Sequence, residues 1–488
     1  MRVPPHLVLA ILGPLHVGSS PATASQETPH PGADADAPMI RLGDRQQTQA
    51  AADIDTQSGV TPLLPCPDQM TKYEPLAEAP PLGITDLNPL LPSPLATLLA
   101  PLRNGESWTK KNMGLSWNIY YTLLYQHATR TNDGLGDNAG SGRLDLNFDW
   151  VIFDEPGIGR GNIGFLLRSG VELGQSDDYA MGNAVGAAPA NLNALQWTYP
   201  ASFDLLYWQQ GWCNDRVVAT VGKVHPNQYI QLSRVANDES RQFLAGVFDG
   251  LNTLGSTLGT YTAGASIQVI PTDGLYVNAV WADPDGGPDR GFGDLGDGSW
   301  WAAAQIGIAP VLNGLDGSEV TGNWNFVFAG TNRGVKASTL QSENQGQSNG
   351  AGFGLVLQEG LTPTNENKNE WSWGVMVEQG LTSDLDLLLQ YGSSTNGMSA
   401  IDRQFNAAIR WDRPFGRNDE AIGAGFSWSR PTDLYDPSRR EIMMIETYYR
   451  IQLTESMQLS PDLQIVLQPA TGADRPVYIF GIRLKTQF

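Results

Sequence analysis

Charged side chains recur at alternate positions of several apolar segments in this sequence. Arg168, Lys223, Glu446 and Arg450 are examples, and Tyr448 places a phenol between two of them. Guanidinium, ammonium and carboxylate groups supply hydrogen-bond donors and acceptors, and an aromatic ring offers an apolar face. Such a mixture suits weak contacts with a neutral, hydroxyl-rich solute better than it suits a filter for ions of one sign. Ordinary solvated charges would give the same pattern.

The sequence contains no convincing motif for catalysis or for metal binding. The sequence has no H-x-x-x-H pair and no P-loop. Residues 346–350 spell G-x-S-x-G, but in a polar loop without the strand and helix that a nucleophile elbow needs, so we interpret this as a chance match. The glycines at 157–161 fit a hairpin turn, and the acidic loop 283–297 lacks EF-hand spacing. We therefore expect no enzyme activity, no cofactor and no metal site.

Composition narrows the class of protein. The 488 residues include 51 acidic and 30 basic ones, and phosphate backbones need clustered Lys and Arg, so we expect no nucleic-acid partner. Two cysteines exclude a scaffold built on disulfides. The absence of a long apolar run excludes a bundle of membrane-spanning helices and leaves a membrane barrel open.

The N-terminal residues predict export. Arg2 precedes a short apolar stretch, and an A-x-A tripeptide at 22–24 follows, which is typical of a signal peptide over residues 1–24. Residues 25–106 are rich in Pro, Ala, Asp and Thr, so we expect a mostly disordered periplasmic extension with a short helix near 95–99. The folded body should then occupy residues 107–488.

From residue 113 onward the hydrophobic period is two. In residues 143–152, apolar side chains at even positions alternate with Arg143, Asp145, Asn147 and Asp149. Side chains two apart share one face of a strand, so one face here is apolar and the other polar. Many of these segments reach the ~9–11 residues of a tilted membrane-spanning strand, whereas soluble strands average about 5–6. Short turns that alternate with long polar loops also favour an outer-membrane barrel.

We therefore predict an all-β fold, a transmembrane antiparallel β-barrel of about 16 strands and of the outer-membrane porin type. Either 321–331 or 350–359 should belong to a long outer loop, because two periplasmic termini require an even number of strands. The candidate strands are 113–127, 143–152, 162–173, 197–209, 216–223, 262–270, 274–282, 299–308, 321–331, 350–359, 370–380, 383–393, 401–412, 420–429, 442–453, 457–468 and 475–488.

The last candidate strand ends on an aromatic residue. Tyr478, Phe480, Ile482 and Leu484 alternate with small and charged residues, and the sequence stops at Phe488. A terminal aromatic on such a strand is the usual signal for the barrel-assembly machinery. We therefore expect that machinery, outer-membrane lipid and lipopolysaccharide as partners, and the cell outer membrane of the Gram-negative type as the location.

Three blocks of the sequence resemble the carbohydrate-selective porins of the OprB family. The first has G-K at 222–223 and A-N-D-E-S-R-Q-F-L at 236–244. The second covers 374–428 and includes R-P-F-G-R-N-D at 413–419, and the third has E-T-Y-Y-R at 446–450. The blocks lie in order and cover most of 113–488. The Trp-Gly-rich opening of many members is missing before the first strand.

This resemblance implies a 16-stranded barrel through which small neutral carbohydrates, such as the monosaccharide glucose, diffuse passively. It also implies that the connection 224–260 folds into the lumen as a constriction, whereas its spacing alone would equally fit a short surface helix over 238–248. The residues expected along the solute pathway are Lys223, Arg234, Asn237, Asp238, Glu239, Arg241, Gln242, Phe243, Arg168, Glu172, Glu446, Tyr448 and Arg450.

Several alternatives stay open at this point. Cys66 and Cys213 could pair and so tie the extension to the inner rim, or remain two free thiols. The barrel could be a monomer or a homotrimer. A general porin without sugar preference, an outer-membrane barrel enzyme and a secreted lectin-like β-sandwich are the competing functions.

Overall fold

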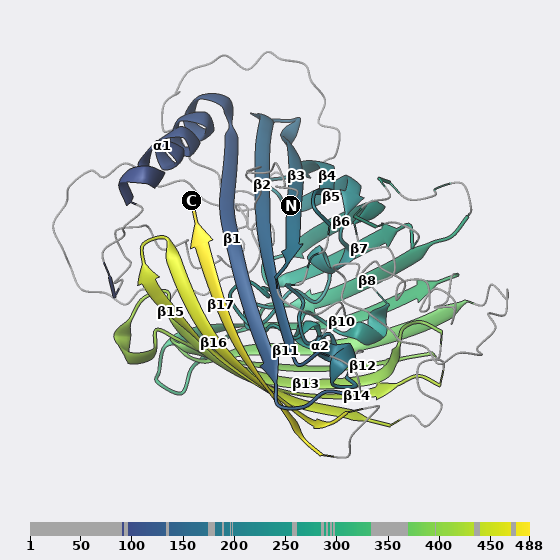
Figure 1. Ribbon diagram of the computed structural model, residues 1–488. Helices are drawn as coiled ribbons and strands as arrows, with labels where there is room; N and C mark the ends of the chain where they lie inside the picture. Colours follow the sequence, from purple (N-terminus) through teal and green to yellow (C-terminus); the bar gives the residue numbers. More distant parts are fainter. Residues whose placement is uncertain are drawn as a thin grey trace, which may run out of the picture.

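The computed structural model describes residues 90–91 and 96–488, except 133–135, 174–180, 188–189, 196, 198, 256–260, 285–286, 289–290, 293–294, 296–297, 333–368, 396, 434–439 and 470–474. Long antiparallel strands wrap around a common interior (Figure 1). None of the helices in this described part is long and apolar enough to cross a membrane.

Seventeen strands are described, all in one sheet. They are β1 (Leu115–Ala128), β2 (Asn138–Glu155), β3 (Gly159–Glu172), β4 (Ser202–Trp212), β5 (Val217–Val224), β6 (Thr262–Thr272), β7 (Leu275–Ala282), β8 (Trp301–Ile308), β9 (Val311–Asn313), β10 (Glu319–Thr331), β11 (Glu370–Thr382), β12 (Leu385–Ser394), β13 (Ile401–Asp412), β14 (Ala421–Pro431), β15 (Ile442–Thr454), β16 (Met457–Gln468) and β17 (Val477–Gln487).

The sheet closes on itself with 16 positions around the ring. β1 pairs with both β2 and β17, so no free edge is left there. β8 and β9 both pair with β10, at 324–331 and 319–321 respectively, and therefore form one interrupted strand of the ring. The predicted closed barrel of 16 strands is confirmed. Candidate 321–331 is β10, while candidate 350–359 lies outside the described residues.

The two faces of each strand explain why this sequence forms a barrel rather than a sandwich. On β10, Trp324, Phe326 and Phe328 are 36–45% exposed, whereas Asn323 and Asn325 on the opposite face are at most 7% exposed. A soluble sandwich buries its apolar face and exposes its polar one. Here the apolar face is outside, as lipid requires, and the polar face lines the interior. The sandwich alternative is therefore wrong.

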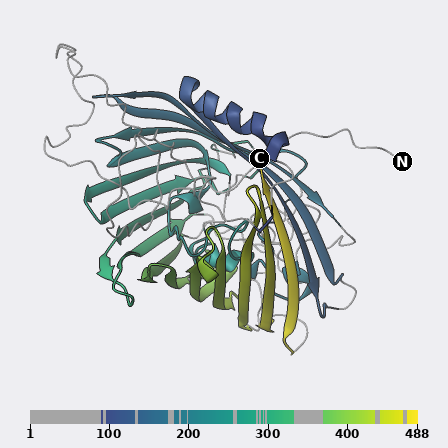
Figure 2. The same cartoon turned by 90° about the vertical axis from the view of Figure 1, so that its left-hand side faces the viewer.

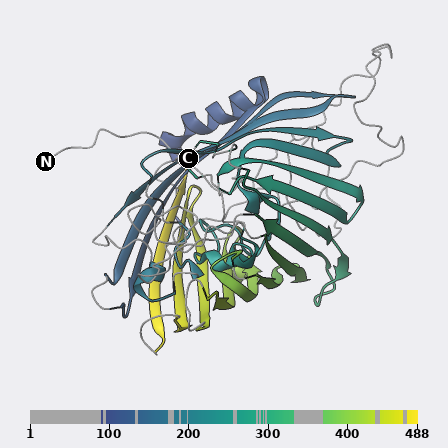
Figure 3. The same cartoon turned by 90° about the vertical axis from the view of Figure 1, so that its right-hand side faces the viewer.

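Within the described residues, one helix precedes the barrel. α1 (Ala96–Met113) lies at the same end of the barrel as the C-terminus (Figures 2 and 3). Its Thr109 accepts a hydrogen bond from the Trp117 indole on β1 at 3.1 Å, and Arg103 forms a 3.4 Å ion pair with Glu455 in the β15–β16 turn. The helix expected near 95–99 is therefore longer than predicted, because contacts with the barrel at Arg103 and Thr109 stabilise the turns beyond residue 99. It crosses the expected boundary at residue 106.

The other helices of the described residues are single short turns that lie between strands. They are α2 (Met181–Ala184), η3 (Pro226–Gln228), η4 (Gly246–Phe248), η5 (Asn252–Leu254) and η6 (Pro414–Gly416).

Candidate solute pathway

The connection between β5 and β6 lies inside the barrel. We call residues 225–255 the inward segment. Its backbone hydrogen-bonds to inward side chains of distant strands: the Gln231 N–H donates to Gln305 on β8 at 2.6 Å, and the Asn252 N–H donates to Gln404 on β13 at 2.8 Å. The predicted inward fold is confirmed. The alternative helix over 238–248 does not form, since only η4 interrupts that stretch.

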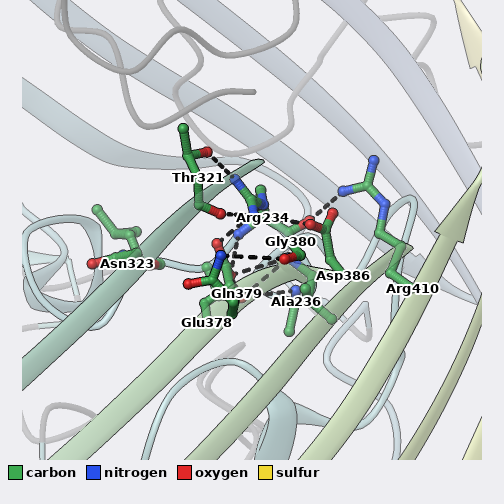
Figure 4. Close-up of polar contacts among 12 residues, drawn as sticks. Arg234, Ala236, Thr321, Asn323, Glu378, Gln379, Gly380, Asp386 and Arg410 are labelled. Carbon is green, nitrogen blue, oxygen red and sulfur yellow. Dashed lines mark hydrogen bonds and ion pairs between the residues drawn. The ribbon is translucent and has the colours of Figure 1, made fainter. Parts of the chain in front are cut away.

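Arg234 of the inward segment contacts three strands of the barrel wall (Figure 4). Its guanidinium donates to the Thr321 hydroxyl at 2.9 Å and to the Thr321 carbonyl at 2.8 Å. It also forms ion pairs with Asp386 at 2.8 Å and Glu378 at 3.3 Å. Three neighbouring strands, β10, β11 and β12, thus meet at one residue that the sequence resemblance placed in the pathway.

Residues 237–242 mainly shape the segment itself. Asn237 has a φ of 88°, accepts from the Ser233 N–H at 2.7 Å and donates to Asp249 at 2.8 Å. Asp238 accepts from the Ser240 N–H at 2.9 Å, and Gln242 donates to the Arg234 carbonyl at 2.6 Å. The A-N-D-E-S-R-Q run therefore encodes a tight, internally bonded loop.

Glu239 connects the segment to the wall formed by β2, β3 and β4. It forms an ion pair of 2.6 Å with Arg143, which lies 2.9 Å from Asp145. Burial raises the pKa of Glu239, but the positive charges of Arg143 and Arg168 outweigh it and hold that pKa below its ordinary value. Asp145 also pairs with Arg168 at 2.9 Å. The prediction omitted Arg143 and Asp145, although both stand in the alternating pattern of 143–152.

Arg241 and Arg450 meet at Asp419, in the turn between β13 and β14. Arg241 pairs with Asp419 at 2.5 Å, and Arg450 pairs with it at 3.6 Å. Burial raises the pKa of Asp419, but the two guanidinium groups bring it below its ordinary value. Asp419 was not predicted as a site residue, although it ends the R-P-F-G-R-N-D block quoted for the family resemblance.

Phe243 and Tyr448 belong to the hydrophobic interior. Their ring centroids are 5.1 Å apart in an edge-on arrangement, and Phe248 lies 4.5 Å from Phe243. Phe243 is 4% exposed and Tyr448 is 2% exposed. The two rings therefore anchor the segment to β15 instead of offering a free aromatic face.

Arg168, Lys223 and Glu172 have different surroundings. Arg168 is buried, donates to the Tyr261 hydroxyl at 2.8 Å and lies 4.4 Å from the Trp197 ring centroid. Lys223 is also buried and donates to the Pro288 carbonyl at 3.1 Å. Glu172 is exposed at the end of β3, and the described contacts do not bring it to the other predicted residues.

A second connection, between β3 and β4, also turns into the barrel. The Leu192 carbonyl accepts from Gln126 on β1 at 3.2 Å and from Gln464 on β16 at 3.0 Å. The Ala194 N–H donates to the Leu244 carbonyl of the inward segment at 2.9 Å. Sequence reasoning missed this contact, because the run of Ala, Gly and Asn around 182–194 has neither periodicity nor charge.

The polar groups that stay partly accessible carry both signs. Arg241 is 33% exposed, Arg410 18%, Asp412 27% and Asp419 17%. Arg410 and Asp412 pair at 2.7 Å, near the barrel end where β13 finishes. A passage of this kind presents donors and acceptors side by side, which matches solutes that carry hydroxyl groups without net charge.

Two further groups on the inward segment have shifted pKa values. Burial, together with the negative charge of Glu239, raises the pKa of Asp249 to about 7. Burial, together with the positive charge of Arg168, lowers the pKa of His225 to about 4. His225 is therefore neutral at pH 7, and its Nδ1 atom accepts from the Asn227 N–H at 3.2 Å.

The last features to place are Cys213 and any metal-binding cluster. Cys213, in the β4–β5 turn, is disulfide-bonded, while its expected partner Cys66 lies outside the described residues. No cluster of three or more His, Cys, Asp or Glu side chains able to hold a metal occurs in the described part of the chain.

Comparisons with known proteins give one family and one fold. The family model described as carbohydrate-selective porin, OprB family, matches residues 201–488. The high-pH structure of Pseudomonas putida OprB is 13% identical with a TM-score of 0.61, and the match covers 79% of this chain and 97% of that one. No curated protein matches the sequence.

Two further solved structures are less similar. The low-pH structure of Pseudomonas putida OprB is 10% identical with a TM-score of 0.46, covering 79% of this chain and 96% of that one. A mutant of the Rh. blastica porin is 11% identical with a TM-score of 0.45, covering 77% and 100%.

Proposed function

The chain belongs to the OprB family of carbohydrate-selective porins, and from this premise we propose that it lets monosaccharides such as glucose diffuse passively across an outer membrane. It acts as a transport channel that discriminates between solutes and does not catalyse a reaction. The solute would pass through the barrel lumen, beside the inward segment.

The observation that carries this proposal is the paired charge along the lumen. Arg241 with Asp419, and Arg410 with Asp412, place a fork of donors next to a carboxylate at partly exposed positions. A sugar hydroxyl can accept from the first group and donate to the second without bringing a charge of its own. Because these groups already satisfy each other, each contact with a sugar stays weak, as passage requires.

The same family membership supports the proposed location and partners. We propose that residues 1–24 are removed on export and that the barrel then lies in the outer membrane among phospholipid and lipopolysaccharide. Assembly would use Phe488 as the recognition signal. The oligomeric state, monomer or homotrimer, can be read from the mass of the detergent-solubilised protein.

Swelling of proteoliposomes tests the proposed function. The purified protein is reconstituted and diluted into isotonic glucose, a disaccharide or the trisaccharide raffinose. We expect fast swelling in glucose, at a rate that falls more steeply with solute size than free diffusion does. Equal preference for sugars and for uncharged non-sugar solutes of the same size would favour a general porin instead.

A further inference from the structure

Two carboxylates of the barrel wall point inward but cannot touch a solute. Glu446 on β15 is 0% exposed and Glu378 on β11 is 1% exposed. Glu446 was predicted to lie along the solute pathway, and Glu378 was predicted only to face the lumen. Both belong to blocks that resemble the family, so their role in this barrel needs an explanation other than contact with sugar.

Each of these carboxylates binds backbone N–H groups of the inward segment. Glu378 accepts from the Arg234 N–H at 2.9 Å and from the Ser233 hydroxyl at 2.5 Å. Glu446 accepts from the Ala245 N–H at 3.0 Å and also from the Leu244 N–H. Successive backbone N–H groups that converge on one anion form a strong and directional contact.

The two contacts hold opposite ends of residues 233–245, the stretch that includes the partly exposed Arg241. Residues 233–234 are fixed to β11 and residues 244–245 to β15, with β12, β13 and β14 between them in the ring. Arg241 lies within the stretch that is held at both ends. Figure 4 shows the first contact, where Glu378 lies beside Arg234 and Asp386.

We propose that Glu378 and Glu446 are positioning residues that fix the inward segment and thereby set the width of the pathway. The inference rests on the proposed function and names the groups that determine its size limit. Neutral Gln has nearly the shape of Glu but only one acceptor oxygen. Its amide N–H group would oppose a backbone donor at position 446 and the Arg234 guanidinium at position 378. A Gln at either position therefore weakens the hold on the segment while leaving the barrel strands paired.

The test uses the full-length protein with Glu378→Gln, Glu446→Gln and the double substitution. Asp149→Asn is the matched control, because Asp149 is a buried inward carboxylate on β2 whose described partners, Asn162 at 2.6 Å and Arg160 at 3.7 Å, belong to β3. Heat-dependent gel mobility verifies that each barrel is folded. If the double variant does not fold, the two single variants carry the test.

Three readouts are compared in planar bilayers and proteoliposomes. We expect the double variant to conduct at least about twofold more ionic current, to take up raffinose faster relative to glucose, and to be cut by trypsin after Arg234 or Arg241. Asp149→Asn should match the wild type in all three. Trypsin reports on the segment itself, since a loop held within the lumen is closed to a protease.

A folded double variant with the conductance and raffinose exclusion of the wild type overturns the proposal, whether or not trypsin cuts it. The proposed function has a separate test, because uptake of glucose by the wild type, compared with an uncharged non-sugar solute of the same size, decides it. A wild type that takes up glucose, beside variants that do not differ from it, would leave the sugar channel standing and remove only the positioning role.

Discussion

At the scale of single residues, the ion pairs of this barrel differ in burial and therefore in how much their loss lowers the free energy of unfolding. Arg234 is 10% exposed and faces Glu378 and Asp386, whereas Arg413 is 51% exposed and faces Asp384 alone. Removing one partner of a buried ion pair leaves an uncompensated charge, while an exposed pair is screened by water. The two arginines therefore give a matched comparison.

Arg234→Ala should lower the free energy of unfolding by roughly 3–5 kcal/mol, because Glu378 and Asp386 lose their shared cation. Arg413→Ala should lower it by about 1 kcal/mol or less. Urea unfolding in detergent micelles, followed by tryptophan fluorescence, measures both. Similar losses for the two variants would contradict the view that Arg234 joins three strands in a desolvated interior.

The pKa of Asp249, raised to about 7, predicts how stability depends on pH. In the unfolded chain this carboxyl has its ordinary pKa near 4, so between about pH 4 and pH 7 the unfolded chain releases the proton that the folded protein keeps. The contribution of Asp249 to stability is therefore most favourable at low pH, declines as pH rises to about 7 and is constant above that.

Asp249→Asn should remove this dependence. The stability of the wild type relative to the variant should fall by a few kcal/mol between about pH 4 and pH 7 and then stay level. Unfolding curves of both proteins at several pH values provide the comparison. A difference that does not change over this range would show that Asp249 ionises normally.

At the scale of elements, strands were the most predictable part of the molecule. The predicted ranges 401–412 and 457–468 coincide with β13 and β16, because the membrane exposes one face of each strand to lipid and the period of two is strict. Inward positions such as Arg143 and Glu378 could be assigned to the lumen for the same reason.

The inward segments could not be predicted in this way. Their residues are held by single hydrogen bonds to distant strands, such as Gln404 to Asn252, and such bonds leave no repeat in the sequence. Family resemblance indicated the β5–β6 connection, but nothing indicated the β3–β4 connection. The length of α1 was also underestimated, since it depends on tertiary contacts with Trp117 and Glu455.

Close packing between β14 and β15 gives a prediction at this scale. Gly423 on β14 lies opposite Tyr448 on β15, and a Cβ atom at Gly423 would overlap the Tyr448 ring. Gly423→Ala should therefore displace that ring from Phe243 and lower the free energy of unfolding by about 1–3 kcal/mol. Gly136→Ala is the control, because its Cβ would meet no atom within 4 Å. Equal stability of the two variants would show that the ring moves freely.

At the scale of the whole molecule, the barrel separates two environments. Its outer face is apolar around the ring. Its interior holds buried charges that pair within a strand, between neighbouring strands, or with the inward segment. Closure through β1 and β17 removes the exposed edges that an open sheet of this size would have. In the described part of the chain, the two inward connections lie within this closed ring.

Sugars are proposed to enter this lumen and to make weak contacts with its paired charges. The most direct measurement is the ionic current through single channels in a planar bilayer as glucose is added to one side. We predict discrete channels whose current falls reversibly and saturably with glucose, and less with an uncharged non-sugar solute of equal size. A current that responds to both solutes only through the viscosity of the solution would contradict the account.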